Sequence, residues 1–194
     1  MAKSLAPIVM KFGGTSLRDE SCREKALDHV KKYAEAGERV VVVVSAMGRK
    51  GEPYSTDTLV NLLKEVGPSI CPRELDLVMS VGESISSAFF THLLTQNGLQ
   101  AISFNGRQAG ILTDDNAGNA EILEINPERI IEALDEGYIT VVAGFQGVND
   151  KGDIRTLGRG GSDTSAVALA AALEAEKVEI FSDVDGIANC DPRL

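Results

Sequence analysis

The residues from 156 to 165 have the composition of a loop that could bind an anion. Three of the four residues at 158–161 are glycines, which free the backbone to lie close to a ligand. The Ala-, Val- and Leu-rich stretch that follows predicts a helix, with Ser162 or Asp163 as its N-cap. Unpaired amides at a helix start attract anions, and Arg159 adds a guanidinium suited to a carboxylate or a phosphate. The alternative is a tight turn before a well-capped helix, with Arg159 in solvent.

Lys11 lies in a second stretch that could bind an anion. The apolar run at 8–12 ends in Gly13 and Gly14, which predicts a buried strand followed by a turn. A phosphate could lie over the two glycine amides while the Lys11 ammonium neutralises the transferred group. The sequence G-x-x-x-x-G-K-[ST] does not occur in the chain, so this would not be a P-loop enzyme. A lysine that extends from a strand end into solvent is the alternative.

Small residues next to polar ones also follow the other predicted strands, at 45–48, 80–83, 144–147 and 182–186. Ligands bind at the C-terminal ends of strands in open parallel sheets, so these strand ends together favour a composite site. Glu83 has a second interpretation, because Ser80-x-x-Glu83 has the spacing of a helix capping box. Asp183 and Asp185 could hold Mg²⁺, but acids are common in turns, and we assign no metal ligand.

These candidate residues depend on an alternation of predicted strands and helices. The strands are predicted at 8–12, 40–44, 75–81, 100–104, 139–144 and 178–182. The helices are predicted at 21–37, 57–66, 83–96, 127–136 and 162–174, with an exposed loop at 114–119 and a hairpin turn at 149–152. Apolar strands that alternate with helices predict an α/β fold, a three-layer αβα sandwich around a mainly parallel sheet.

Composition excludes several classes of partner. With 19 basic and 29 acidic residues the net charge is −10, so we expect neither nucleic acid nor an anionic membrane as a partner. No apolar run approaches 18 residues, and from this we expect no membrane span. The three cysteines form no CxxC pair, which argues against a disulfide framework or a zinc site and favours a reducing cytoplasm.

Taken together, the motifs resemble aspartate kinase, of the amino acid kinase superfamily. The segments concerned occur in the order typical of that family and span essentially the whole chain: 11–16, 45–48, 80–83, 144–147, 156–165 and 182–193. The resemblance implies transfer of the γ-phosphoryl group of ATP, with Mg²⁺, to the side-chain carboxylate of L-aspartate. The product would be 4-phospho-L-aspartate, formed in the first step towards lysine, threonine and methionine.

The resemblance also implies a role for each candidate residue. Arg159 would bind the α-carboxylate of aspartate and Glu83 its ammonium, while Asp163 would organise the catalytic Lys11. The rest of the amino-acid side would be Ser45, Thr56, Gly160, Gly161 and Ser162. The nucleotide side would be Lys11, Gly13, Gly14, Ser182, Asp183 and Arg193.

The sequence departs from the family pattern at Ala188, where tyrosine is usual, and at Arg155, where threonine is usual. The kinase domain of the family also continues beyond Leu194. We therefore interpret residues 1–194 as the N-terminal, substrate-binding part of a single amino acid kinase domain, without the C-terminal nucleotide part or the ACT domains. We expect weak or no turnover by this chain alone, and a homo-oligomer or a partner chain that completes the kinase. The alternatives are a related kinase for glutamate, N-acetylglutamate, carbamate or UMP, and a non-catalytic aspartate-binding module.

Overall fold

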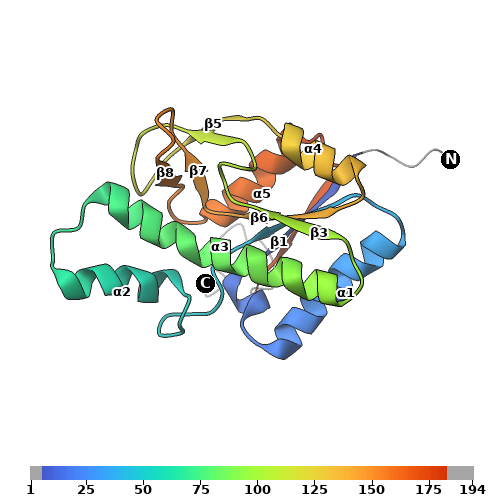
Figure 1. The fold of residues 1–194 in the computed structure, drawn as a ribbon, viewed down its shortest axis with the longest axis horizontal. Helices are drawn as coiled ribbons and strands as arrows, with labels where there is room; N and C mark the ends of the chain where they lie inside the picture. Colours follow the sequence, from blue (N-terminus) through green and yellow to red (C-terminus); the bar gives the residue numbers. More distant parts are fainter. Residues whose placement is uncertain (1–5, 183–194) are drawn as a thin grey trace, which may run out of the picture.

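A sheet of five parallel strands lies at the centre of the computed structural model, which describes residues 6–182 (Figure 1). Its strands, in spatial order, are β3 (Ala101–Phe104), β6 (Ile139–Ala143), β2 (Val40–Val44), β1 (Ile8–Phe12) and β9 (Lys177–Phe181). Every residue of β1, β2 and β6 is buried, which explains why these strands have nearly continuous apolar sequences. The predicted strands at these positions are confirmed to within a residue or two. The spatial order of the strands was not predictable from the sequence.

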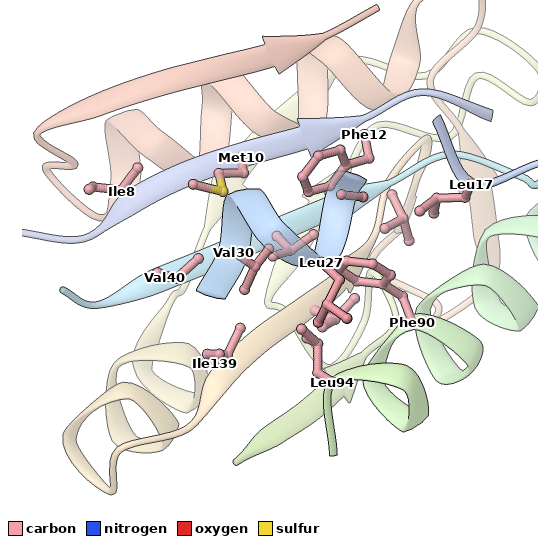
Figure 2. Packing of buried hydrophobic residues seen from close by; sticks show 14 residues of the cluster. Ile8, Met10, Phe12, Leu17, Leu27, Val30, Val40, Phe90, Leu94 and Ile139 are labelled. Atoms are coloured by element: carbon pink, nitrogen blue, oxygen red, sulfur yellow. The ribbon is translucent and has the colours of Figure 1, made fainter. Parts of the chain in front are cut away.

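Helices cover both faces of this sheet. The helices α1 (Glu20–Glu35) and α3 (Pro72–Gln96) pack on one face, and α4 (Glu128–Asp135) and α5 (Gly161–Ala172) pack on the other (Figure 1). Side chains alternate along β1, so Met10 and Phe12 join Val30, Phe90 and their neighbours on the α1–α3 face (Figure 2). The predicted three-layer αβα sandwich is therefore confirmed.

A smaller sheet lies beside the main one and receives the loops from its strand ends. Its order is β5 (Ile122–Ile125), β4 (Ile111–Thr113), β7 (Gln146–Val148) and β8 (Ile154–Thr156). Strands β7 and β8 pair antiparallel, which confirms the hairpin turn predicted between them. The sequence analysis did not predict β4 and β5, each of which has only three or four residues.

The largest error among the predicted elements concerns helix α3. Residues 75–81, predicted as a strand, and 83–96, predicted as a separate helix, form one helix of 25 residues. Ser80 is therefore not a capping residue; it lies inside α3, and its hydroxyl donates to the carbonyl of Leu77 at 2.8 Å. The short apolar run at 75–81 fits a strand and a buried helix equally well, because its length is too small to distinguish the two periods.

Length and composition alone would also allow α3 to cross a membrane, contrary to the absence of a long apolar segment inferred above. Its buried residues include Asp76, Ser80 and Glu83, and it packs against β3, β6 and β8. Polar groups buried against a sheet are typical of the core helix of a globular domain. Two further helices complete the described chain: the 3-10 helix η1 (Gly14–Leu17) and α2 (Thr56–Val66).

Candidate active site

One pocket of about 470 Å³ collects the predicted site residues at the C-terminal edge of the main sheet. Its lining includes every predicted site residue among those described: Lys11, Gly13, Gly14, Ser45, Thr56, Glu83, Arg159, Gly160, Gly161, Ser162, Asp163 and Ser182. Of the other residues singled out, Asp183, Asp185, Ala188 and Arg193 lie outside the described residues. Segments far apart in the sequence thus meet where strands β1, β2, β6 and β9 end.

A buried lysine forms one side of the pocket. Because side chains alternate along β1, Lys11 points to the face opposite Met10 and Phe12, towards α5. Its Nζ lies 2.7 Å from Oδ1 of Asp163, in the first turn of α5. Lys11 is only 7% exposed, so this ion pair fixes the position of the ammonium more firmly than a pair in solvent would.

The start of α5 forms the part of the pocket next to Lys11. Its N-cap is Gly160, with φ of 76°, and no side chain caps the helix, so the predicted N-cap at Ser162 or Asp163 is wrong. The N–H groups of Gly161 and Asp163 donate to the carbonyls of Gly158 and Gly160, at 3.1 and 2.9 Å, which leaves the Ser162 amide available to a ligand at the positive end of the helix dipole. Arg159 stands next to this end; it is exposed and makes no ion pair or hydrogen bond with any residue in the range 6–182.

Glu83 is a carboxyl group buried in the wall of the pocket. It is 3% exposed, and its Oε1 accepts a hydrogen bond from the backbone N–H of Ala46 at 3.0 Å. Its Oε2 has no hydrogen-bond partner within the described part of the chain. Burial raises the pKa of Glu83 to about 7, and the Ala46 hydrogen bond offsets part of that rise. A cationic ligand group in the pocket would supply the missing partner.

The neighbouring glycine makes this placement of Glu83 possible. A Cβ added at Gly82 would lie 2.7 Å from Cβ of Ala46 and 3.0 Å from the carbonyl oxygen of Tyr54. Such distances are too short for a side chain, so glycine lets α3 approach the end of β2 closely. Glu83, expected at a strand end, lines the pocket from the middle of a helix instead.

Sequence reasoning did not assign five further residues that line the pocket: Thr15, Ala46, Gly48, Phe145 and Gly158. Phe145 is the most unusual, because it is not glycine and yet has a φ of 66°. Its N–H donates to the hydroxyl of Ser165 at 3.0 Å, which holds this conformation against α5. Strain at such a position is typical of functional sites, and the only signal in the sequence was the pair of glycines around Phe145 and Gln146.

Arg155, the residue that departs from the family pattern, belongs to a charged cluster outside the pocket. Its Nε donates to Oδ1 of Asp115 at 3.0 Å, and Lys151 and Asn149 bond to the same carboxylate. Hydrogen bonds from Lys151, Arg155 and Asn149 hold the pKa of Asp115 well below its usual range. The loop at 114–119 is exposed as predicted, but Asp115 is a paired group rather than a solvated acid.

The pocket contains groups that fit an amino acid and a phosphate, and none that form a metal centre. No group of three or more metal-ligating side chains occurs in the described range. Lys11 and the amide of Gly14 offer positive charge and a donor in the pocket, whereas the N–H of Gly13 donates to the carbonyl of Phe181 at 3.3 Å. Glu83 and Arg159 line the same pocket and offer opposite charges, which is the pairing that an α-amino acid requires.

The pocket lies at the strand ends of a three-layer sandwich, and the chain belongs to the amino acid kinase family, whose model matches residues 6–194. It is 54% identical over 187 residues to aspartokinase 1 of Bacillus subtilis, covering 96% of this chain and 46% of that protein. It is 48% identical to an aspartokinase of Mycolicibacterium smegmatis over 98% of this chain and 44% of the relative. The chain thus spans about half the length of the curated relatives it matches.

Solved structures give the same result. The aspartate kinase from Synechocystis matches with a TM-score of 0.78 and 44% identity, over 97% of this chain and 30% of that chain. Aspartokinase III of E. coli, solved in complex with aspartate and ADP, matches with a TM-score of 0.79 and 30% identity. That match covers 96% of this chain and 51% of that chain.

Proposed function

We propose that this chain forms the substrate-binding part of an aspartate kinase, which transfers the γ-phosphoryl group of ATP to the side-chain carboxylate of L-aspartate. The observation that supports this most strongly is the pairing of Glu83 and Arg159. Both side chains line one pocket; among residues 6–182, Arg159 makes no ion pair or hydrogen bond, and Oε2 of Glu83 has no hydrogen-bond partner. The relatives named aspartokinase support the choice of amino acid.

In this proposal the two ends of aspartate bind to different parts of the pocket. Arg159 and the Ser162 amide bind the α-carboxylate, and Glu83 accepts hydrogen bonds from the ammonium. Ser45, Thr56, Gly160, Gly161 and Ser162 line the rest of the amino-acid side. The side-chain carboxylate then points towards Lys11, whose ammonium Asp163 holds in place at 2.7 Å. Fixing both reactants in this way converts a bimolecular reaction into an effectively unimolecular one.

The chemical step needs little covalent participation by the protein. An oxygen of the aspartate side chain attacks the γ-phosphorus, the bond to the β–γ bridging oxygen breaks, and ADP leaves; no proton is transferred. Lys11 and the amide of Gly14 neutralise charge on the phosphates, and Ser182 and Gly13, whose own N–H donates to Phe181, line the pocket with them. Mg²⁺ bound to ATP would add to that neutralisation. Asp183 and Arg193 belong to the proposed nucleotide side and lie outside the described residues.

We further propose that residues 1–194 are the N-terminal part of a single amino acid kinase domain. The match to about half of each relative supports this, with the remaining nucleotide contacts supplied by other residues of the full protein or by a partner chain. The proposed setting is cytoplasmic biosynthesis of the lysine, threonine and methionine group, by a protein that forms homo-oligomers.

Calorimetric titration with L-aspartate tests the amino-acid side directly. We expect Arg159→Ala to weaken aspartate binding by about 100-fold, because a charge-assisted bidentate contact is lost. Arg129→Ala is the matched control, because Arg129 is exposed and lies over the ring of Phe104 outside the pocket. Equal binding by the wild type and Arg159→Ala would contradict the assignment.

A panel of acceptors separates the alternatives. With MgATP and hydroxylamine, an acyl phosphate product is trapped as a hydroxamate, so the rate can be compared for aspartate, glutamate and N-acetylglutamate. Turnover with aspartate by the full-length protein supports the kinase. Aspartate binding without turnover in the full-length protein would instead support a non-catalytic module, and faster turnover with another acceptor would identify a different kinase of the family.

A further inference from the structure

Three polar groups on one buried face of α3 each bond to a different segment around the pocket. Asp76, Ser80 and Glu83 are four and then three residues apart, so they lie on the same side of the helix. Glu83 bonds to the N–H of Ala46 after β2, and the carbonyl of Ser80 accepts from the side chain of Gln146 on β7 at 2.9 Å. Helix α3 therefore connects the pocket walls, and Asp76 provides the third connection.

Asp76 is fully buried, and its carboxyl group bonds to two separate segments. Oδ1 accepts from the hydroxyl of Thr156 at 2.6 Å, and both oxygens accept from the N–H of Gly118, at 3.0 and 3.2 Å. Thr156 ends β8, and Gly118 lies in the loop after β4. One side chain thus joins α3, β8 and this loop, and it does not itself line the pocket.

The segments that Asp76 joins determine where Arg159 lies. The N–H of Ala120 donates to the carbonyl of Thr156 at 2.9 Å, so the loop and the end of β8 are bonded to each other as well. Gly158 then packs on this loop: a Cβ added there would lie 2.4 Å from Oδ1 of Asn119. Gly158 has a φ of 73° and directly precedes Arg159, so a shift of Thr156 or Gly118 moves the arginine.

We propose that Asp76 is a positioning residue that fixes Arg159 relative to Glu83 and thereby selects aspartate over the longer glutamate. The inference rests on the proposed function, in which Glu83 and Arg159 bind the two α-substituents of the substrate. When Glu83 and Arg159 are held at a fixed spacing, the distance from the bound α-substituents to Lys11 fits only one length of substrate side chain. Glutamate is one methylene longer, and a difference of one methylene typically changes discrimination by about 10-fold to 200-fold.

The test removes one hydrogen bond without changing the shape of the side chain. Thr156→Val deletes the hydroxyl that donates to Asp76, and Thr156→Ser restores a hydroxyl. Thr140→Val is the matched control, because Thr140 is also fully buried but its Oγ1 has no hydrogen-bond partner among the described residues. Dissociation constants for L-aspartate and L-glutamate are measured by calorimetry on the complete chain, each variant corrected for its folded fraction.

We expect Thr156→Val to weaken aspartate binding by about tenfold, with little change for glutamate, so that the ratio of the two constants falls. Thr156→Ser should recover most of that ratio, and Thr140→Val should keep it. A merely destabilising change leaves both dissociation constants unchanged once the folded fraction is corrected. A Thr156→Val protein with the wild-type ratio would overturn the proposal.

Amide hydrogen exchange without ligand separates this inference from the proposed function. Peptides that cover residues 157–161 should exchange faster in Thr156→Val than in the wild type, whereas the amides of β2 should exchange at the same rate in the two proteins. Failure of the wild type to bind aspartate would refute the proposed function and the selectivity together. The exchange rates would still decide whether Asp76 holds the loop, and an unchanged rate at 157–161 would show that it does not.

Discussion

Asp76 and Glu83 occupy the same buried face of α3, two helical turns apart, and differ in how their oxygens are used. Asp76 is 0% exposed and accepts hydrogen bonds from both Thr156 and Gly118. Glu83 is 3% exposed, and one of its oxygens has no partner within residues 6–182. The two acids have nearly equal burial, so burial alone does not explain the difference.

The difference separates an acid whose oxygens both accept hydrogen bonds from the fold from one that leaves an oxygen without a partner among residues 6–182. Burying a carboxyl group is unfavourable unless hydrogen bonds replace those lost from water. Within the chain Asp76 receives these bonds, and so it contributes to stability. Glu83 receives one of them, and its pKa of about 7 reflects the remaining cost. An oxygen left in this state next to a pocket is a strong indication of a ligand.

The largest expected effect is on the free energy of unfolding, and it concerns Asp76. Asp76→Ala should lower the free energy of unfolding by about 3 kcal/mol, because it leaves the buried hydroxyl of Thr156 and the N–H of Gly118 without their acceptor. Urea denaturation followed by circular dichroism measures this change. Asp28→Ala, at an exposed position of α1, is the control and should stay within about 0.5 kcal/mol of the wild type. A loss at Asp76 as small as at Asp28 would remove the distinction between the two acids of α3.

A smaller effect of opposite sign is expected at Glu83. Glu83→Gln should raise the free energy of unfolding at pH 8 by about 1–2 kcal/mol, because the buried negative charge is removed while an acceptor for the Ala46 amide is kept. The same variant should lose most of its aspartate binding, because the ammonium loses its counter-charge. Denaturation at pH 8 and calorimetry measure the two changes, and a variant that is both less stable and fully able to bind would contradict the assignment.

The pH dependence of stability provides a second measurement at Glu83. Its pKa rises from 4.5 to about 7 on folding, so the folded chain binds the proton more tightly than the unfolded chain. The stabilising contribution of the protonated form is fully present below pH 4.5 and is lost as the pH rises through 7. Glu83→Gln should remove this decrease, and denaturation curves at several pH values check it. A decrease that persists unchanged in Glu83→Gln would assign the titration to another group.

The strands around the pocket were easier to predict from the sequence than helix α3, which carries Asp76 and Glu83. The all-valine run at 40–44 allowed little besides a buried strand, and the small residues at 13–14, 45–48 and 144–147 marked the ends of β1, β2 and β6. Helix α3 was divided into a strand and a helix, because its buried face mixes apolar residues with Asp76, Ser80 and Glu83. The partners of those polar residues lie far away in the sequence and meet them only in the folded chain. The local pattern alone therefore resembles a strand that ends in a capping box.

Asp76 could not be recognised from the sequence for the same reason. Its partners, Thr156 and Gly118, are 80 and 42 residues away, and nothing in the pattern around residue 76 indicates them. The glycine loop was easier to recognise, because Gly158, Arg159 and Gly160 are consecutive and local conformation determines much of their shape. A local glycine pattern was enough to select Arg159 as a candidate, whereas Asp76, which we propose positions it through distant contacts, could not be selected in this way.

The smallest expected effect tests whether an unpartnered buried oxygen indicates a ligand wherever it occurs. Oγ1 of Thr140, on β6, also has no hydrogen-bond partner in the described part of the chain, but Thr140 does not line the pocket. Thr140→Val should raise the free energy of unfolding by about 1 kcal/mol, because a buried hydroxyl without a partner is replaced by a methyl group of the same shape. Aspartate binding should be unchanged, in contrast to Glu83→Gln, which gains stability but loses binding. Urea denaturation and calorimetry on the two variants side by side check this.

A loss of aspartate binding in Thr140→Val would contradict this prediction. It would mean that removing a buried polar group from the main sheet disturbs the pocket even at a distance. The loss of binding in Glu83→Gln would then no longer indicate direct contact between Glu83 and the ligand.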